Sequence, residues 1–431
     1  MGEVTVRATK ALKGEVEAPP SKSYTHRMLI AALLSKGKTV IEKPLVSDDT
    51  LATLDAVEAF GAEVKQSGEL WEIDGQIPLK TPVEPVNCRE SGATLRFMIP
   101  VAALASGETT FLRGHGLSSR PIEPLLESLR QLGVKTRCNA EKPFTITVQG
   151  GGIRGRKTTL RGDISSQFIS GLMFACPLAQ KDTEIALTTP MESKSYVEMT
   201  KEVLCTHSIR INISEDFSLI QVPSGQVYRP VRHRVPGDFS SAAYLMAAAA
   251  ITSSKIIIRN LSYATKQGDR AILEILRQAG LETKIGEDFI EVEGALCMAI
   301  DVDAKDIPDL VPACTAIACY AKGTSTIRNA GRLRYKESDR IKALYTEFGK
   351  MGADIKIEGD TLRVRGPCKL HGAVIDPYGD HRIAMACAVA ALGASSDTVI
   401  LNAECVRKSY PQFFKDLSLL GANIVGGEFH W

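Results

Sequence analysis

The sequence has little net charge and lacks long apolar runs. Its 52 lysines and arginines nearly balance 50 aspartates and glutamates, so the formal net charge is only +2. That balance provides no overall field for holding a nucleic-acid backbone or an anionic membrane. The longest uninterrupted apolar runs, 242–251 and 383–392, are ten residues each, well short of the ~18 that a bilayer crossing needs. We therefore expect no membrane span and neither a nucleic-acid nor a membrane partner.

The sequence also lacks a paired cysteine motif. Ten cysteines are scattered from Cys88 to Cys405 without a Cys-x-x-Cys pair or a histidine at ligand spacing, which matches no zinc site. A chain of this length buries enough surface to fold without disulfides. We expect reduced, mostly buried thiols, no metal and no cofactor. Glu3, Arg7 and Lys10 near the N-terminus, with no apolar segment behind them, are unlike a secretory signal, so we expect a cytoplasmic protein.

An internal repeat organises the chain. Six segments of helical periodicity each end at a small residue and are followed by an alternating strand pattern. These junctions are spaced 72, 75, 72, 72 and 69 residues apart. Glycine after a helix is the usual C-cap, and the following residues mostly match a β-hairpin. The junctions are Gly61, Gly133, Ser208, Gly280, Gly352 and Gly421.

A second helical segment, rich in alanine and other small residues, occupies the other half of each repeat. Helices that are apolar on nearly every side are buried helices. Each is followed by a short strand pattern, so one repeat contains a buried helix, a strand, a more amphipathic helix and a hairpin. This predicts an α/β protein. The six segments are 25–34, 93–105, 166–179, 240–251, 313–321 and 381–392.

Six repeats contain too many residues to pack around one hydrophobic core, so we expect two domains of three repeats each. The segment 229–236 has prolines at 230 and 236 and is the best mid-chain linker. The sixth repeat stops at Ile424 without a hairpin partner, whereas residues 3–17 form a hairpin-like segment with no helix before it. We therefore expect a discontinuous domain of residues 1–20 and 231–431, completed by the N-terminal hairpin, and an inserted domain of residues 21–230.

Polar clusters, all but one of which contain cations, stand near the starts of the buried helices or in neighbouring loops. Each alone has an ordinary explanation, such as helix capping or a solvated helix start. Lysine or arginine at a helix start opposes the macrodipole unless an anion also sits there. The clusters are Lys22-Ser23-Arg27, Ser119-Arg120-Pro121, Ser165-Ser166-Gln167, Ser193-Lys194-Ser195-Tyr196, Lys336-Glu337-Ser338-Asp339-Arg340, Asp380-His381-Arg382 and Arg407-Lys408-Ser409.

Together these clusters offer at least seven cations that can serve one site, in a chain of nearly zero net charge. If the repeats fold pseudo-symmetrically, equivalent helix ends point the same way, toward a cleft between the domains. Such a site suits an acidic small molecule that carries phosphate or carboxylate groups. Asp309 and Glu337 are the carboxylates nearest the clusters and suit general acid–base work. The seven cations are Lys22, Arg27, Arg120, Lys336, Arg340, Arg382 and Lys408.

Motifs along nearly the whole chain resemble those of the EPSP synthase (3-phosphoshikimate 1-carboxyvinyltransferase) family in order and spacing. The most specific part is KESDR followed by DHR and a late lysine. The motifs are SKSYTHR at 21, ESGATLR at 90, SRP at 119, SSQF at 165, SKSY at 193, PGDFSSAAY at 236, PD at 308, LRYKESDR at 333, GDHR at 379 and RKSYPQF at 407.

The resemblance implies the two-domain enolpyruvyl transferase fold, an inside-out α/β barrel in which each domain has three repeated βαβαββ units around a pseudo-threefold axis. The active site is then in the cleft between the domains. The implied reaction transfers the enolpyruvyl group of phosphoenolpyruvate to the 5-hydroxyl of shikimate 3-phosphate through a tetrahedral ketal. It belongs to the shikimate pathway to chorismate and aromatic amino acids. The resemblance implies no cofactor, and we expect a monomer.

The resemblance also assigns residues. It implies Asp309 as the base on the 5-hydroxyl, Glu337 as the proton donor to the enolpyruvyl methylene, and Lys22 as a further catalytic group. The residues implied for shikimate 3-phosphate are Lys22, Ser23, Arg27, Ser165, Ser166, Gln167, Ser193, Tyr196, Asp309 and Lys336. Those implied for phosphoenolpyruvate are Lys22, Gly92, Arg120, Gln167, Arg340, Arg382 and Lys408.

Three positions depart from the usual pattern of the family. Ala93 stands where threonine is common, Phe97 where many members have proline, and Arg332 where an asparagine often contacts the substrate. These differences bear on the response to the inhibitor glyphosate and on one polar contact, and not on the class of reaction. The resemblance assigns no role to Arg332 or His381.

Two other functions stay open at this point. UDP-N-acetylglucosamine enolpyruvyl transferases share the fold and the enol donor, but they carry a cysteine five residues before their loop arginine, where this chain has His115. They also carry asparagine after the first lysine, where this chain has Ser23. A non-catalytic repeat protein that binds polyanions would need the cations but not Asp309 and Glu337.

Overall fold

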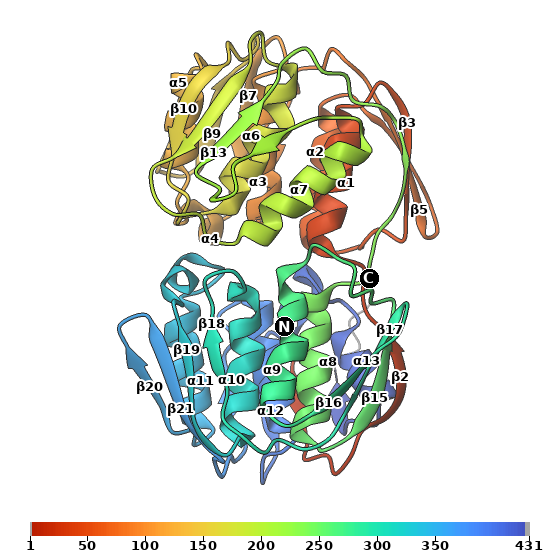
Figure 1. Ribbon diagram of the computed structural model, residues 1–431, viewed down its shortest axis with the longest axis vertical. Coiled ribbons are helices and arrows are strands. Elements are labelled where there is room, and N and C mark those ends of the chain that lie inside the picture. Colours follow the sequence, from red (N-terminus) through yellow and green to blue (C-terminus); the bar gives the residue numbers. More distant parts are fainter. Residues whose placement is uncertain (1, 427–431) are drawn as a thin grey trace. The chain divides into compact units, whose positions relative to one another are not determined.

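The structure, a computed structural model that describes residues 2–426, divides into two compact units. The inserted unit is Ser21–Val235, and the discontinuous unit joins the residues up to Pro20 with those from Pro236 onward. Each unit contains three four-stranded sheets. Figure 1 shows the long helices of each unit running side by side, with the sheets on their outer sides.

The inserted unit contains three buried helices and three more amphipathic ones. The buried helices are α1 (Lys22–Leu33), α3 (Gly92–Ala102) and α6 (Ser166–Ala175). The others are α2 (Asp48–Ala59), α5 (Glu123–Gln131) and α7 (Lys194–Thr206), with a short α4 (His115–Ser118). Its strands are β3 (Gly37–Glu42), β4 (Glu63–Ser67), β5 (Leu70–Gly75), β6 (Val86–Asn87), β7 (Glu108–Leu112), β8 (Thr136–Cys138), β9 (Thr145–Gln149), β10 (Arg156–Leu160), β11 (Thr183–Leu187), β12 (Asn212–Ile213), β13 (Leu219–Val222) and β14 (Arg232–Arg234).

The discontinuous unit repeats the same plan. Its buried helices are α8 (Phe239–Ile251), α10 (Val311–Tyr320) and α12 (His381–Ala391), and the others are α9 (Ile272–Gln278), α11 (Arg340–Lys350) and α13 (Phe413–Leu419). Its strands are β1 (Val4–Val6), β2 (Lys13–Glu17), β15 (Lys255–Arg259), β16 (Glu282–Ile285), β17 (Phe289–Glu293), β18 (Asp301–Asp303), β19 (Gly323–Arg328), β20 (Ile355–Glu358), β21 (Thr361–Gly366), β22 (Val374–Ile375), β23 (Thr398–Ile400) and β24 (Ile424–Gly426).

All six sheets have the same strand order and directions. In each, the first strand is parallel to the second, and the third lies antiparallel between the second and the fourth, as in β6-β7-β9-β8 and β18-β19-β21-β20. Six small mixed sheets of one topology are what six copies of one repeat predict. The predicted α/β fold class is therefore confirmed.

The buried helices form where the sequence places small apolar residues on every side. In α8, all residues from Phe239 to Ala250 are buried, and in α12 every residue is buried. Alanine has the highest helix propensity and lets neighbouring helices approach closely. Each unit therefore has its own apolar core around its three central helices.

The six predicted junction residues all lie just after a helix with positive φ, the left-handed region that glycine adopts without strain. Gly61 has φ 101° and Gly421 has φ 101°, and Ser208, the one serine among them, has φ 68°. The repeat boundaries predicted from these residues are thus helix C-termini.

The chain ends and the mid-chain linker differ from the prediction. Residues 3–17 do not form a hairpin, because β1 pairs with β23 and β24 while β2 pairs with β15 in another sheet. β1 nevertheless supplies the strand that the sixth repeat lacks. The predicted linker 229–236 contains a strand, β14, which pairs with β3 of the inserted unit.

All ten cysteines are free, but only half of them are buried, fewer than expected. Cys138, Cys205 and Cys297 are exposed.

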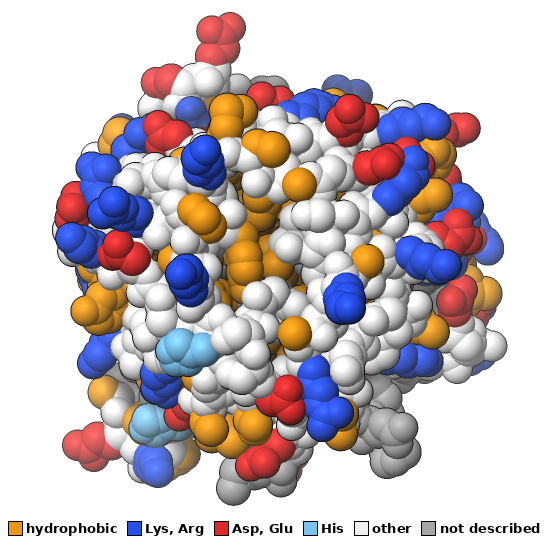
Figure 2. Space-filling model, turned by 90° about the horizontal axis from the view of Figure 1, so that it is seen from below, with side chains coloured by type: hydrophobic (Ala, Val, Ile, Leu, Met, Phe, Trp, Pro, Cys, Tyr) orange, Lys and Arg blue, Asp and Glu red, His pale blue; other side chains and the backbone are white. Residues whose placement is uncertain are grey.

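Within residues 2–426, no helix combines the length and apolarity that a bilayer crossing requires. On the face drawn in Figure 2, basic and acidic side chains alternate around a central area of hydrophobic ones, so neither sign of charge dominates that face.

Candidate functional site

Polar side chains cap the three buried helices of the inserted unit. Ser21 accepts a hydrogen bond from the backbone N–H of Tyr24 and Ser165 from that of Gln167. Ser91 caps α3 in the same way. The predicted residues Lys22, Gly92 and Ser166 are the first residues of these helices. A helix N-terminus carries partial positive charge and free N–H groups, which suits anions.

Lys22 is held by a carboxylate that the sequence did not single out. Its Nζ lies 3.1 Å from Oδ2 of Asp49, in the first turn of α2. The lysine side chain is 18% exposed, whereas that of Asp49 is 7% exposed. This ion pair fixes the position of the ammonium group.

Arg27 is buried on α1. Its Nε donates to the Thr200 hydroxyl at 2.8 Å, Nη1 donates to the Ser23 carbonyl at 2.9 Å, and Nη2 donates to the Tyr196 carbonyl at 3.0 Å. Burial lowers the pKa of Arg27 to about 10, so it stays charged at neutral pH. The predicted residues Ser23, Arg27 and Tyr196 thus lie together.

A second group surrounds Gly92. A side chain at this position would put its Cβ 3.4 Å from Nη1 of Arg96, 3.5 Å from Nη1 of Arg120 and 3.7 Å from Oε1 of Gln167. Arg96 Nη1 donates to Gln167 Oε1 at 2.8 Å. Two guanidinium groups therefore approach one glycine at the start of α3. Arg96 was not predicted as a site residue, although it lies in the ESGATLR motif one helical turn after Gly92.

The remaining predicted residues of the inserted unit are Ser193, Ser165 and Ser166. Ser193 is buried and has φ 56° directly before α7, and its carbonyl accepts from the Tyr196 N–H at 3.1 Å. A serine in the left-handed region is uncommon and often belongs to a functional site. Ser165 and Ser166 are buried at the start of α6.

In the discontinuous unit, Arg340 is the centre of a buried ion-pair network. Its Nε lies 2.8 Å from Asp380 Oδ2, its Nη1 2.9 Å from Asp309 Oδ1, and its Nη2 2.6 Å from Glu337 Oε2. Burial alone would lower the pKa of Arg340, but the three carboxylates outweigh it and raise that pKa. The guanidinium is therefore a permanent charge at the start of α11.

Asp309, in the short helix η3 (Pro308–Leu310), contacts three cations. Its carboxylate lies 2.9 Å from Arg340, 3.3 Å from Arg382 Nη2 and 3.4 Å from Lys336 Nζ. Burial favours its neutral form, but the cations outweigh burial and hold the pKa of Asp309 well below its usual range. Burial also lowers the pKa of Lys336. Asp309 is thus ionised at neutral pH.

Arg382 and Lys408 complete this network. Arg382 lies in the first turn of α12, where its backbone N–H donates to Asp380 Oδ1 at 3.0 Å. Its Nη1 donates to the Asp309 carbonyl at 3.3 Å. Lys408, at the end of η5 (Ala403–Lys408), has its Nζ 3.9 Å from Glu337 Oε1. All six predicted residues of this unit therefore lie in one network.

The sequence analysis missed one carboxyl group near that network. Asp269, in η2 (Gly268–Ala271), is 3% exposed and accepts a hydrogen bond from the Ser240 hydroxyl. Burial, reinforced by the charge of Asp309, raises the pKa of Asp269. An ordinary Gly-Asp-Arg start of a helix carried no signal of this burial.

Two residues without an assigned role have clear contacts. Arg332, in η4 (Gly331–Tyr335), donates to the Lys305 carbonyl at 3.1 Å. His381 is buried at the first position of α12, with Nδ1 3.8 Å from Asp380 Oδ1.

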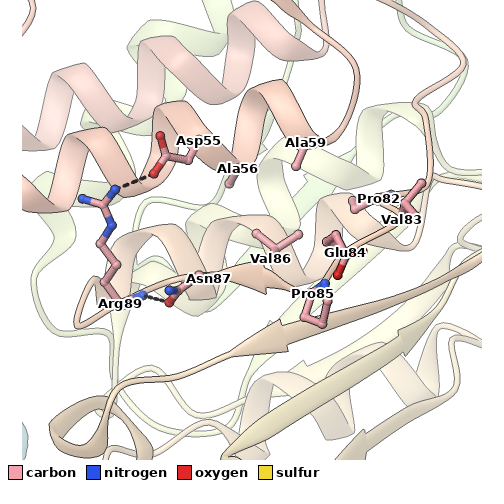
Figure 3. Close-up of a pocket in the computed structure, with 10 residues that line it drawn as sticks. All are labelled: Asp55, Ala56, Ala59, Pro82, Val83, Glu84, Pro85, Val86, Asn87 and Arg89. Atoms are coloured by element: carbon pink, nitrogen blue, oxygen red, sulfur yellow. Dashed lines mark hydrogen bonds and ion pairs between the residues drawn. The ribbon is translucent and has the colours of Figure 1, made fainter.

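Residues 2–426 contain no group of three or more histidine, cysteine, aspartate or glutamate side chains placed to hold a metal ion. A pocket of about 380 Å³ lies in the inserted unit. Its lining residues come from α2 and the segment 82–89 (Figure 3). An ion pair of 2.6 Å between Arg89 and Asp55 lies at this pocket. Its lining shares no residue with the predicted site.

Comparison with known proteins identifies the family. The EPSP synthase (3-phosphoshikimate 1-carboxyvinyltransferase) family matches residues 6–417. The 3-phosphoshikimate 1-carboxyvinyltransferase of Methanococcus maripaludis (strain C5) is 39% identical over 428 residues, 98% of this chain and 99% of that protein. The enzyme of that name from Methanocorpusculum labreanum is 43% identical over 417 residues, 96% of this chain and 97% of that protein.

The fold agrees with that identification. A solved structure of EPSP synthase from Acinetobacter baumannii superposes with a TM-score of 0.83 at 25% identity, covering 99% of this chain and 100% of that one. Family match, relatives and fold thus extend over nearly the whole chain, as the motifs do. The chain belongs to the EPSP synthase family, the 3-phosphoshikimate 1-carboxyvinyltransferases.

Proposed function

We propose that the residues gathered above carry out the family's reaction, the transfer of an enolpyruvyl group from phosphoenolpyruvate to the 5-hydroxyl of shikimate 3-phosphate. The observation that carries the assignment of roles is the network around Asp309 and Arg340. It joins two candidate acid–base carboxylates to four cations in one place. The reaction belongs to the shikimate pathway of aromatic amino acid biosynthesis.

The cations bind the anionic groups of the two substrates. Guanidinium groups bind phosphate and carboxylate through paired hydrogen bonds, which fixes orientation as well as charge. Arg120, Arg340 and Arg382, with Lys22 and Lys408, are the proposed ligands of phosphoenolpyruvate. They belong to both units, so the proposed reaction uses residues of both. This arrangement stabilises charge without a metal ion.

Asp309 is the proposed base for the 5-hydroxyl. In the structure its charge is balanced by Arg340, Arg382 and Lys336, which makes it a weak base. When phosphoenolpyruvate binds Arg340 and Arg382, its own negative charge compensates these cations. The carboxylate then becomes more basic at the time when the hydroxyl must lose its proton.

Glu337 is the proposed proton donor to C3 of the enol. The 5-hydroxyl oxygen adds to C2, C3 accepts the proton, and a tetrahedral ketal forms. Return of a proton from the C3 methyl group to Glu337 and departure of phosphate from C2 then give the enolpyruvyl ether. Glu337 is bound by Arg340 at 2.6 Å and lies 3.9 Å from Lys408, so its carboxyl group is held in position for both steps.

The experiment measures phosphate release from phosphoenolpyruvate with either of two acceptors. We expect release with shikimate 3-phosphate and none above background with UDP-N-acetylglucosamine. Release with only the nucleotide sugar would reverse the assignment of acceptor, and binding without turnover would support a non-catalytic protein. We further propose that the protein is cytoplasmic and monomeric. Sedimentation equilibrium of the purified chain tests whether it is a monomer.

A further inference from the structure

Arg27 is a buried cation without a carboxylate. Arg27 is 2% exposed, and no carboxylate among residues 2–426 forms an ion pair with its guanidinium group. Arg340 is buried to the same degree, but three carboxylates surround it. Because an uncompensated buried charge is costly, other groups must hold the Arg27 guanidinium in place.

Three hydrogen bonds and two aromatic rings hold Arg27. One N–H on each of its three nitrogens donates to Thr200, Ser23 or Tyr196. A guanidinium has five N–H groups, so one remains on each Nη. Its Cζ lies 5.2 Å from the centroid of the Phe97 ring and 5.7 Å from that of Tyr196. Both distances fall within the ~6 Å of a cation–π contact, which is strongest where water is excluded.

The core fixes the Phe97 ring. Phe97 is fully buried on α3 and meets the Phe174 ring of α6 edge to face, with 5.6 Å between the centroids. A ring packed in this way cannot swing to follow a mobile arginine. It therefore defines where the guanidinium lies.

We propose that Phe97 is a positioning residue for shikimate 3-phosphate. Together with Tyr196, it holds the Arg27 guanidinium so that the two remaining N–H groups serve the phosphorylated ring substrate. This inference rests on the proposed function, in which Arg27 binds that substrate. The inference extends the proposed function in one respect. The affinity for shikimate 3-phosphate, and not that for phosphoenolpyruvate, depends on Phe97, a side chain that touches neither substrate.

The test compares Phe97→Leu with the matched variant Phe111→Leu, which removes a ring from another fully buried aromatic pair of the same unit, Phe60–Phe111. We expect Phe97→Leu to raise the KM and the calorimetric Kd for shikimate 3-phosphate about fivefold or more, the scale of a desolvated cation–π contact. The kcat and the KM for phosphoenolpyruvate should change less than twofold. Phe111→Leu should leave all of these constants within twofold of the parent protein.

Two further variants separate the ring from its packing. Phe97→Met, which also lacks a ring, should raise the Kd for shikimate 3-phosphate as Phe97→Leu does. Phe97→Tyr keeps the ring and should retain the Kd of the parent protein. An unchanged Kd for shikimate 3-phosphate in Phe97→Leu and Phe97→Met would overturn the proposal. So would an equal rise in both KM values, which indicates general loosening. If the parent protein itself failed to bind shikimate 3-phosphate, the proposed function would be wrong as well.

Discussion

At the scale of single residues, Asp309 and Glu337 are the two carboxylates proposed to transfer protons, and each contacts cations assigned to a substrate. Asp309→Asn and Glu337→Gln should each lower kcat by ~10² or more, since a positioned acid or base contributes on this scale. Stopped assays of phosphate release give the rates. Asp301→Asn, at an exposed ion pair with Arg328, is the control and should keep the parent rate.

The fold of both variants should survive, because each substitution is nearly isosteric and leaves a hydrogen-bonding group in place. Thermal unfolding of each variant checks this expectation. Near-normal turnover in both Asp309→Asn and Glu337→Gln would show that neither group transfers a proton.

The sequence predicted the residues that repeat a local pattern and missed those that depend on packing. Lys22, Arg340 and Arg382 stand at helix starts, which periodicity and capping residues reveal without a structure. Asp49 and Asp269 also stand in ordinary helix starts, and nothing local indicates that one binds Lys22 and the other lies buried beside Ser240. Their contacts arise only when helices far apart in sequence pack together.

At the scale of elements, three of the hairpins meet the end of a buried helix through a glycine. A Cβ on Gly75 would lie 2.2 Å from the Ala32 carbonyl, one on Gly150 2.1 Å from that of Ala105, and one on Gly366 2.3 Å from that of Ala321. No real Cβ approaches backbone so closely. Close approach of hairpin and helix is therefore a requirement that these three repeats share.

Substitution of such a glycine should destabilise its unit. We expect Gly366→Ala to lower the free energy of unfolding by about 1–3 kcal/mol, as overpacking against backbone does. Gly349→Ala is the matched control in the same unit, because Gly349 lies in α11 with open space around it. It should be neutral or raise the free energy of unfolding by about 0.5–1 kcal/mol. Urea titration measures both, and equal stability of the two variants would contradict this packing argument.

The N-terminal strands show where element prediction from sequence ends. Residues 3–17 alternate as a hairpin does, but strand pairing is decided by which sheet has a free edge. β1 fills the sixth sheet beside β23, and β2 pairs in parallel with β15. Those edges are created by residues some 240 to 400 positions away, so no local signal specifies them.

At the scale of the whole molecule, buried histidines make stability depend on pH. Burial lowers the pKa of His26 and of His233 to about 3, and that of His207 to about 4. His207 and His233 face each other with 2.8 Å between their Nε2 atoms, which leaves room for one proton. Since the unfolded chain titrates near 6.5, it binds more protons than the fold below that pH, and stability is lost as the pH falls from about 6.5.

The midpoint temperature of thermal unfolding should therefore be lower at pH 5.5 than at pH 7.5. Burial raises the pKa of Asp269 and Asp416, which acts in the opposite sense, so a variant must isolate the histidines. His26→Gln keeps a hydrogen-bonding partner for Thr53 and removes one titrating group. Its midpoint should depend less on pH than that of the parent protein. An unchanged slope would mean that His26 does not contribute.

The central claim is that one reaction uses cations from both units, and the KM for phosphoenolpyruvate tests it most directly. Arg120→Lys changes the inserted unit and Arg382→Lys the discontinuous one, and each keeps the charge while losing the paired hydrogen bonds of a guanidinium. Arg130→Lys, at a partly exposed ion pair with Glu123, is the control. We expect the KM for phosphoenolpyruvate to rise about tenfold in both site variants, the effect of ~1.4 kcal/mol in binding, and to stay unchanged in the control. A parent-like KM in either site variant would contradict the claim.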